Sequence, residues 1–457
     1  MNIRKKFIKT NIKLYQVLVV MIIVLASWGM RVAYIYNTKV DNPVRADARD
    51  YVSTGYNLAR HHIYSSVVMK AVPPVPDKKR PPGYPFFLAA IFAMTRNFPN
   101  FFNTVLNTQC ILDTLTVLGT FLIACRFLPF WAAIAAAILT GISPHLIVMT
   151  GYLLSETLYS FLLLFGILFS TLAVKKQKPL FYLVSGILFA AATLTRSALV
   201  LFPLVVAFCM FFIASGIRKR NLKLVSIFLV GFLILLLPWS LRNMRLKIPE
   251  NRKFNPALTS FIHGSYPNFT YKTARYYGYP YREDPQISFM MKNWKNTFGV
   301  LKTRFVKAPW SYLKWYLGGK ILALWQWDNR AGGTGDIYVY PFVKSGFRDV
   351  AILRLDRIIA KISYLPSLLL GLLGMVLFAI GRKWKDPEYF GLMVCLALLL
   401  YFAGIHTILA PFPRYSVPLR PYLFILGMFA LSDIWERWKH WNSSPSTERV
   451  SNNENLS

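Results

Sequence analysis

The stretch Thr157-Leu-Tyr-Ser-Phe-Leu-Leu-Leu-Phe-Gly-Ile-Leu-Phe-Ser-Thr-Leu-Ala-Val174 decides the fold of this chain. It holds no charged residue, and the basic run Lys175-Lys-Gln-Lys178 follows it directly. A helix needs roughly 20 mostly apolar residues to cross a bilayer, so this stretch is long enough for one crossing. It lacks the alternation of a strand, and in lipid only helices or closed barrels satisfy the backbone. The stretch therefore predicts a transmembrane helix.

Similar uncharged runs recur along the sequence, at residues 14–30, 127–155, 179–195, 197–217 and 362–381. The hydrophobic fraction is 55% and the charged fraction 16%, whereas about a quarter of a soluble domain is charged. We therefore expect an all-α polytopic membrane protein with about ten transmembrane helices. The expected spans lie near residues 14–36, 104–125, 130–150, 153–174, 179–195, 197–215, 222–241, 360–381, 389–410 and 415–435.

The strong positive charge of the chain comes largely from its loops. The formal net charge is +34, from 53 Lys and Arg against 19 Asp and Glu. Many cations form short clusters between apolar runs, such as Arg218–Arg220 and Arg382–Lys385, as the positive-inside rule describes for cytoplasmic loops. No aromatic–basic recognition motif accompanies them, so we expect no nucleic-acid partner. The clusters place both termini on the cytoplasmic side and residues 37–103 and 242–357 outside.

This topology divides the chain into four parts. They are a transmembrane core at 1–243 with its outer loop 37–103, an outer segment at 244–357, the last transmembrane helices at 358–436 and a disordered cytoplasmic tail at 437–457. In the outer loop, the apolar stretch Tyr84–Met94 is too short to span, so we expect it in the membrane interface. In the outer segment, the aromatic stretch Trp310–Trp327 predicts an interfacial helix.

Three carboxylates are candidate functional groups, because an acid close to the hydrocarbon is costly. Asp47 and Asp50 lie in the first outer loop, and Glu156 precedes an apolar run at the outer face. Each also has a structural alternative. Asp47 could cap a helix over Ala48–Arg60, with Asp50 as its capping-box acid, and Glu156 could face the positive end of a helix dipole. The residue types alone leave both interpretations open.

Four arginines, Arg80, Arg196, Arg242 and Arg414, lie in the first outer loop or at the outer ends of expected spans. A guanidinium can bind phosphate through two parallel hydrogen bonds, which suits a lipid phosphate. Snorkelling of a long side chain toward the interface explains any single one of them equally well. The histidines show no ligand spacing on one helix face, so no metal site is predicted and the use of a cofactor is left open.

Short motifs follow one another along the chain. They are Asp47-x-x-x-Tyr51, Arg80-Pro-Pro-Gly-Tyr84-Pro85, Ser143-Pro144 with Gly151-Tyr-Leu-Leu-Ser-Glu156, Gly186–Arg196, Pro238-Trp239 with Arg242-Asn243, and Arg414-Tyr415 with Pro418. Each is weak alone. In this order and on one membrane face, they resemble the GT-C superfamily of polytopic glycosyltransferases, in particular the bacterial relatives of the protein O-mannosyltransferases and of the lipid A aminoarabinose transferases.

The resemblance implies a GT-C-like bundle whose first outer loop carries interfacial helices. It implies a hexosyl- or pentosyltransferase that uses a polyprenyl-phosphate-linked sugar and acts on a glycan, lipid or protein acceptor at the outer face, in a bacterial inner membrane. By the same resemblance, the catalytic residues are Asp47 and Glu156, and the residues that bind the lipid phosphate are Arg80, Arg242 and Arg414. Possible accessory residues are Asp50, Tyr51, Tyr84, Arg196 and Tyr415.

The chain also departs from the family. Lys79 stands where some members have a metal-binding glutamate, and Asp50 stands where some have an arginine. The metal and the acceptor of those members are therefore not carried over.

Two other classes stay open. A flippase for lipid-linked oligosaccharides, or a polysaccharide polymerase or ligase, would also be polytopic and basic, but would not need an acid in the first outer loop. A secondary transporter would show paired broken helices and symmetric halves, and the sequence shows neither.

Overall fold

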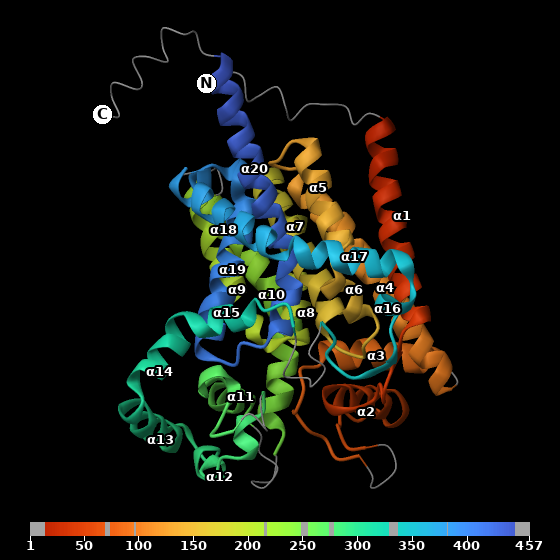
Figure 1. Ribbon diagram of the computed structural model, residues 1–457, viewed down its shortest axis with the longest axis vertical. Helices are drawn as coiled ribbons and strands as arrows, with labels where there is room; N and C mark the ends of the chain where they lie inside the picture. Colours follow the sequence, from red (N-terminus) through yellow and green to blue (C-terminus); the bar gives the residue numbers. More distant parts are fainter. Residues whose placement is uncertain are drawn as a thin grey trace.

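The computed structural model describes residues 14–68, 74–95, 97–213, 217–247, 255–273, 278–328, 337–381 and 383–443. It is a bundle of helices, most of which run along one axis (Figure 1). Its α-helices are α1 (Leu14–Asn37), α2 (Ala46–His61), α3 (Gly83–Met94), α4 (Phe98–Ala124), α5 (Phe130–Gly141), α6 (Pro144–Thr150), α7 (Glu156–Lys176), α8 (Pro179–Thr195), α9 (Phe202–Ile213), α10 (Arg218–Arg245), α11 (Pro256–Gly264), α12 (Ile287–Met290), α13 (Trp294–Lys307), α14 (Pro309–Lys314), α15 (Lys320–Leu324), α16 (Gly346–Asp349), α17 (Ala351–Ile362), α18 (Tyr364–Ile380), α19 (Phe390–Ile408) and α20 (Arg420–Ser443).

Six of the described helices, α1, α4, α7, α10, α19 and α20, are long and apolar enough to cross a membrane. The number is eight if each of two bent pairs counts as one span, with bends of 49° between α5 and α6 and 51° between α17 and α18. The expected spans at 179–195 and 197–215 correspond to α8 and α9, which are apolar but shorter than a full crossing. The all-α polytopic class is therefore confirmed.

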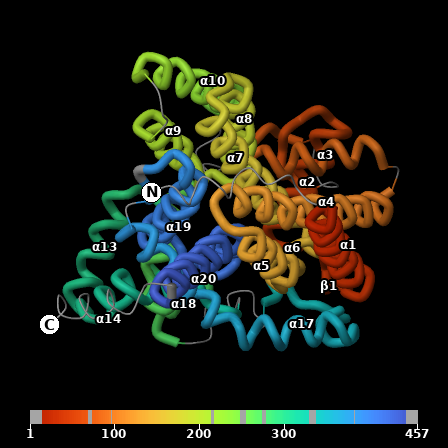
Figure 2. The backbone as a smooth tube through the Cα atoms, turned by 90° about the horizontal axis from the view of Figure 1, so that it is seen from above, coloured from red at the N-terminus to blue at the C-terminus, as the bar shows by residue number. Residues whose placement is uncertain are grey.

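Glycines allow the closest helix contacts in the bundle. A Cβ atom on Gly186 of α8 would lie 2.1 Å from the Phe228 carbonyl oxygen of α10, and one on Gly231 would lie 2.5 Å from the Leu183 carbonyl oxygen. Small residues permit such backbone contact between helices in lipid. Figure 2 shows α8, α9 and α10 grouped on one side of the bundle, with α1 and α4 on another.

The expected outer loop crosses one end of the bundle as two helices, α2 and α3 (Figure 1). They pack closely because Gly55 has no side chain: a Cβ there would lie 2.8 Å from the Leu88 Cβ atom. The expected interfacial stretch Tyr84–Met94 is helix α3. Strand β1 (Lys39–Val40) pairs antiparallel with β2 (Phe342–Lys344), with Lys39 opposite Lys344, and so ties this loop to the outer segment.

The outer segment contains a small helical unit at residues 255–324, defined here as the outer unit, within which 274–277 are outside the described residues. Its own core consists of Leu258, Ile262, Tyr266, Met290 and Val300. The helix expected at Trp310–Trp327 is present as one continuous helical stretch, which consists of α14, a π-helical turn at Trp315–Gly319, and α15. Its place in the membrane interface stays a prediction. Residues 248–254 and 329–336 of the outer segment lie outside the described residues.

The start of the tail differs from its expected disorder. Helix α20 continues to Ser443, because Trp435 stacks on Trp438 with ring centroids 5.1 Å apart and Arg437 pairs with Asp433 at 2.8 Å. Side chains three and four residues apart are neighbours on a helix and stabilise it. The rest of the expected disordered tail, residues 444–457, lies outside the described residues.

Candidate active site

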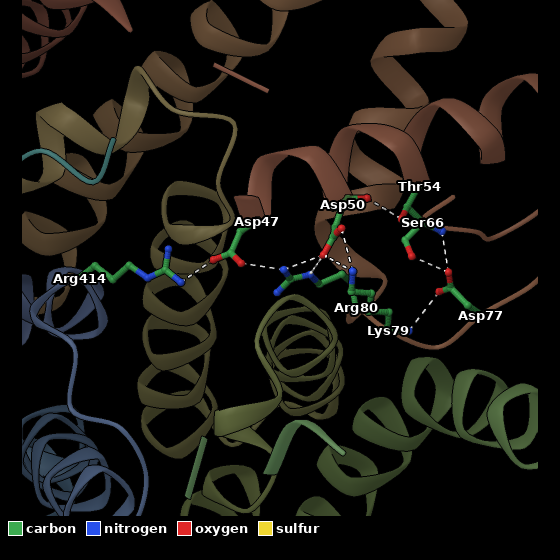
Figure 3. Close-up of polar contacts among 8 residues, drawn as sticks. All are labelled: Asp47, Asp50, Thr54, Ser66, Asp77, Lys79, Arg80 and Arg414. Carbon is green, nitrogen blue, oxygen red and sulfur yellow. Dashed lines mark hydrogen bonds and ion pairs between the residues drawn. The ribbon is translucent and has the colours of Figure 1, made fainter. Parts of the chain in front are cut away.

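Asp47 lies in the first turn of α2 and points toward two arginines rather than toward the helix backbone. The helix begins at Ala46, and its N-cap residue Arg45 makes no side-chain cap hydrogen bond. Asp47 Oδ1 accepts a hydrogen bond from Arg80 Nη2 at 2.7 Å, and Oδ2 accepts one from Arg414 Nη2 at 2.5 Å (Figure 3). The helix thus starts two residues earlier than expected, and Asp47 does not cap it.

Asp50 also binds the Arg80 guanidinium, through both Nε and Nη2. Its Oδ2 accepts hydrogen bonds from Arg80 Nε at 3.0 Å and from Arg80 Nη2 at 2.8 Å, and Lys79 Nζ donates to Oδ1 at 3.0 Å (Figure 3). The residue is 5% exposed. Because both oxygens are engaged by cations, Asp50 is not the capping-box acid of α2. It holds Arg80 in place beneath Asp47.

The loop that carries Arg80 is pinned from both sides. Asp77 Oδ2 accepts hydrogen bonds from the Ser66 amide at 2.7 Å and from the Ser66 hydroxyl at 2.6 Å, and Tyr64 donates its hydroxyl proton to the Arg80 carbonyl at 2.8 Å. Gly83 then packs against the end of α8, where a Cβ would lie 2.3 Å from the Thr195 hydroxyl oxygen. This contact requires glycine in the Arg-Pro-Pro-Gly motif.

Glu156 forms the second acidic centre at the start of α7. It is 2% exposed, and its Oε1 lies 2.7 Å from Arg196 Nη1 and 3.9 Å from Arg414 Nε. The ring of Tyr415 lies under both arginines, at 4.8 Å from Arg196 Cζ and 5.3 Å from Arg414 Cζ. Arg414 therefore connects Asp47 of the outer loop to Glu156 of the bundle.

The site is electrostatically biased toward an anion. Burial alone would raise the pKa of the Asp47 carboxyl, but the charges of Arg414 and Arg80 hold that pKa well below its usual value. The acids in this network are Asp47, Asp50 and Glu156, and the cations are Lys79, Arg80, Arg196 and Arg414. The cations outnumber the acids by one, and arginine stays protonated in proteins. A phosphate would fit this excess charge.

Two of the candidate tyrosines brace the site. The Tyr51 ring lies 5.2 Å from Arg80 Cζ and meets the Tyr84 ring edge-on at 5.2 Å. Tyr84 donates its hydroxyl proton to Gln109 Oε1 at 2.8 Å. Gln109 in turn donates to the carbonyls of Thr150 and Tyr152, both at 2.9 Å. Tyr84 thus links α3 to α4 and to the turn that leads into Glu156.

Arg242 is the candidate that lies apart from this network. Its Nη1 donates to the Asp77 carbonyl at 2.6 Å, and its guanidinium lies 5.1 Å from the Tyr64 ring and 4.8 Å from the Trp239 ring. It stands at the rim of a mostly apolar groove of about 680 Å³ between α3, α7, α8 and α10. The groove is lined by Pro82, Gly83, Phe86, Leu158, Leu194 and Ile234, among others.

Two tyrosines of the outer segment join the site without any motif in the sequence. Tyr340 is 7% exposed, and the Arg45 guanidinium lies 5.8 Å from the centre of its ring. Burial raises the pKa of this hydroxyl, and the negative charge of Asp47 raises it further. The pKa of Tyr279 is also raised, first by burial, while the nearby charge of Arg414 opposes the shift. Each lies among other tyrosines in the sequence, within Tyr276–Tyr281 and Tyr338–Tyr340. Nothing in the sequence distinguishes these two from their neighbours, so sequence reasoning could not single them out.

No group of three His, Cys, Asp or Glu side chains that could hold a metal ion is found among the described residues. The cation Lys79 contacts Asp50 directly, at the position for which the sequence resemblance implies a metal-binding glutamate in some family members. The residues present here fit an anionic ligand better than a metal ion.

Comparison with known proteins gives one family and one fold. Residues 79–241 match the family model of dolichyl-phosphate-mannose-protein mannosyltransferases. No curated protein matches the sequence significantly. The matched residues include Arg80, Glu156 and Arg196, but Asp47 and Arg414 lie outside them.

Solved structures of an archaeal oligosaccharyltransferase from Archaeoglobus fulgidus share the fold. AglB in complex with an inhibitory peptide and a dolichol-phosphate aligns at a TM-score of 0.52 with 13% identity over 96% of this chain and 53% of that chain. The apo form aligns at 0.54 with 14% identity over 96% of this chain and 54% of that chain. This chain therefore spans about half the length of these structures.

ArnT from Cupriavidus metallidurans bound to undecaprenyl phosphate aligns at a TM-score of only 0.37, with 13% identity over 91% of this chain and 78% of that chain. That score does not establish a shared fold. The mannosyltransferase match and the oligosaccharyltransferase fold both support the resemblance drawn from the sequence. The chain is a polytopic membrane protein whose residues 79–241 are similar to the dolichyl-phosphate-mannose-protein mannosyltransferases and whose fold is similar to that of an archaeal oligosaccharyltransferase.

Proposed function

We propose that this protein transfers a sugar from a polyprenyl-phosphate donor to a glycan, lipid or protein acceptor at the outer face of the membrane. One observation carries the proposal: the Asp47 carboxylate lies between Arg80 and Arg414, at 2.7 Å and 2.5 Å, at one end of the helix bundle. A carboxylate base beside fixed cations is what such a transfer needs. The base takes the acceptor proton, and the cations stabilise the leaving phosphate.

The donor would bind with its lipid tail in the apolar groove between α3, α7, α8 and α10. The groove begins at Pro82 and Gly83, next to Arg80, and Arg242 stands at its rim. Apolar walls suit a prenyl chain, and guanidinium groups suit a phosphate. Arg80 and Arg414 are the proposed phosphate ligands at the reacting end. Arg242 would contact the headgroup at the groove rim rather than the reacting phosphate.

The two hydrogen bonds to Asp47 indicate how donor binding turns it into a base. Both of its oxygens accept hydrogen bonds from arginine, and a carboxylate held in this way accepts a proton poorly. A donor phosphate competes for the same guanidinium groups and so withdraws positive charge from Asp47. The pKa of Asp47 then rises toward its ordinary value. Donor binding thus prepares the base that the acceptor needs.

In the transfer step, the acceptor oxygen forms a bond with the anomeric carbon while the bond from that carbon to the phosphate oxygen breaks. The acceptor proton passes to Asp47, and the electron pair of the broken bond stays on the polyprenyl phosphate, beside Arg80 and Arg414. A single displacement of this kind inverts the anomeric carbon. Glu156 fixes Arg196 and the far side of Arg414, so we assign it the orientation of the site rather than proton transfer.

Each part of the chain has its own proposed role. The core at 1–243 would bind the donor, and the outer segment at 244–357 would select the acceptor, since, in addition to burial, the negative charge of Asp47 raises the pKa of the hydroxyls of Tyr279 and Tyr340. The helices at 358–436 would complete the site through Arg414. We propose a bacterial inner membrane as the location, with both termini on the cytoplasmic side.

The direct test is release of polyprenyl phosphate by the purified protein in lipid nanodiscs. A panel of polyprenyl-phosphate sugars is supplied together with extracts of envelope glycan, lipid or protein, and both products are followed by mass spectrometry. We expect acceptor-dependent release from at least one donor, with inversion at the anomeric carbon. In proteoliposomes, which separate two compartments, movement of an intact donor across the bilayer without release would favour a flippase, and joining of lipid-linked oligosaccharides would favour a polymerase or ligase.

A further inference from the structure

Arg414 depends for its position on a short non-helical linker, residues 409–412. Helix α19 ends at Ile408, and Arg414 is the second residue of the 3-10 helix η11 (Pro413–Leu419). The guanidinium must nevertheless reach Asp47 at 2.5 Å. Something other than the two flanking helices therefore has to fix the path of the linker.

Lys320, the first residue of α15, holds the start of this linker. Its side chain is fully buried, and Nζ donates to the carbonyl oxygens of Thr407 at 2.9 Å, Ile408 at 3.1 Å and Leu409 at 3.3 Å. Carbonyls at a helix C-terminus lack intrahelical partners, and the helix dipole favours a cation there. Burial lowers the pKa of Lys320 to about 7, so the ammonium form depends on these acceptors.

Other residues of the outer unit contact the linker at Leu409, Ala410 and Phe412. A Cβ on Gly264 would lie 2.5 Å from the Leu409 carbonyl oxygen, and the Ala410 amide donates to Ser260 Oγ at 3.4 Å. Phe412 stacks on Phe269 with ring centroids 4.9 Å apart. These contacts run from the end of α19 to the residue two before Arg414.

The backbone around Lys320 departs from a regular helix. The residues before it, Trp315–Gly319, form a π-helical turn, which is rare and often occurs at functional sites. Trp315 Nε1 donates to the Gly264 carbonyl at 2.9 Å. Lys320 follows this turn directly and binds the end of α19. Trp315 of the same turn fixes Gly264, which contacts the linker at Leu409.

We propose that Lys320 is a positioning residue that places Arg414 through the linker, and that the outer unit thereby determines whether the Asp47 site is assembled. Lys320 touches no reacting group; it acts through Arg414. The consequence for catalysis rests on the proposed glycosyl transfer, whereas the grip on the linker does not. An acceptor that binds the outer unit would act on Arg414 by the same route.

The first arm of the test does not require activity. Hydrogen–deuterium exchange of the peptide that covers residues 409–419 is measured in nanodiscs for the wild type, Lys320→Met and Lys314→Met. Methionine keeps the length of the side chain but donates no hydrogen bond. Lys314 of α14 is exposed, so it is the matched control. We expect exchange in Lys320→Met to be on the order of tenfold faster, with no change in Lys314→Met. Unchanged exchange in folded Lys320→Met overturns the proposal.

The second arm is a double-mutant cycle on transfer with Arg414→Gln. If Lys320 acts through Arg414, Lys320→Met lowers kcat on the order of tenfold in the wild-type background and less than about twofold in the Arg414→Gln background. Lys320→Arg, which keeps the charge and donors, should recover part of kcat. Equal losses in both backgrounds would show that Lys320 acts elsewhere and would overturn the positioning role.

A second variant covers the case in which Lys320→Met does not fold. Phe269→Leu removes the stack on Phe412 from the outer unit, and it should give a smaller rise in exchange and the same dependence on Arg414. If the wild-type protein showed no transfer, the proposed function would be refuted. If exchange were still faster in these variants, the contacts of the outer unit with the linker would be confirmed independently. Slow exchange in both folded variants would refute the grip whatever the activity.

Discussion

Replacement of Arg80 by alanine removes a side chain that contacts both acids of the first outer loop. In the wild type, Arg80 Nη2 lies 2.7 Å from Asp47 Oδ1 and 2.8 Å from Asp50 Oδ2. In the variant, Asp47 keeps Arg414 and Asp50 keeps Lys79. The fold should survive, because the loop is held by the Asp77–Ser66 hydrogen bonds. The loss should therefore fall on the transition state.

The magnitude follows from the role of a fixed donor to developing charge. Loss of one such donor costs about 3 kcal/mol, which corresponds to a decrease on the order of 10²-fold in kcat. Arg80→Lys keeps the charge but not the planar fork that now reaches both acids, and a loss on the order of tenfold is expected. The two variants together separate charge from geometry.

The assay is the initial rate of polyprenyl phosphate release at saturating donor, with thermal unfolding measured on the same samples. Lys78→Ala is the matched control, because Lys78 is an exposed cation two residues before Arg80, and it should keep the wild-type rate. A folded Arg80→Ala protein that released polyprenyl phosphate at the wild-type rate would refute the phosphate-binding role of this loop.

Three further predictions concern folding and pH. Glu156→Gln removes the negative charge that pairs with Arg196 at 2.7 Å, so it should lower both the melting temperature and the transfer rate, since breaking a buried ion pair from one side costs up to about 3–5 kcal/mol; loss of transfer alone would contradict this. Gly186→Leu should separate α8 from α10 and cost at least about 1–3 kcal/mol in thermal unfolding, whereas Gly404→Ala, which has open space at its Cβ, should be neutral. The pKa of Asp47 is lowered in the folded protein. Its contribution to stability should therefore be present above its unfolded pKa of about 4 and be lost as the pH falls below that value. The melting temperature of Asp47→Asn should accordingly depend less on pH below about 4 than that of the wild type.

Much of the bundle could be predicted because lipid imposes simple rules. Uncharged runs such as Thr157–Val174 correspond to helices, since no other open structure satisfies the backbone in hydrocarbon. The lengths were harder to predict. The expected spans at 179–195 and 197–215 are apolar enough, but Arg196 interrupts them and turns inward to Glu156. A charged residue between two apolar runs can equally mark a loop or a buried ion pair.

The candidate site could be predicted in part from the order of short motifs along the chain. Motif order brought Asp47, Arg80, Glu156, Arg196 and Arg414 together in one hypothesis, and the structure brings these side chains together in one network. Their roles stay predictions.

The sequence could not show that Arg242 turns toward Asp77. The direction of a long side chain at a helix end depends on the residues that surround it. Nor could it show Lys320, because a lysine that binds helix carbonyls looks like any other cation in a basic segment.

The central claim is that Asp47 takes the acceptor proton, and the rate of transfer by Asp47→Asn tests it most directly. Asparagine is nearly isosteric with aspartate but cannot accept a proton at neutral pH. Asp50→Asn, which loosens Arg80 from one side, should keep measurable transfer, and Asp41→Asn, an exposed acid of the same loop, should match the wild type. We predict a loss on the order of 10²-fold or more for folded Asp47→Asn protein with a polyprenyl-phosphate donor. Transfer by that variant at a near-normal rate would contradict the account.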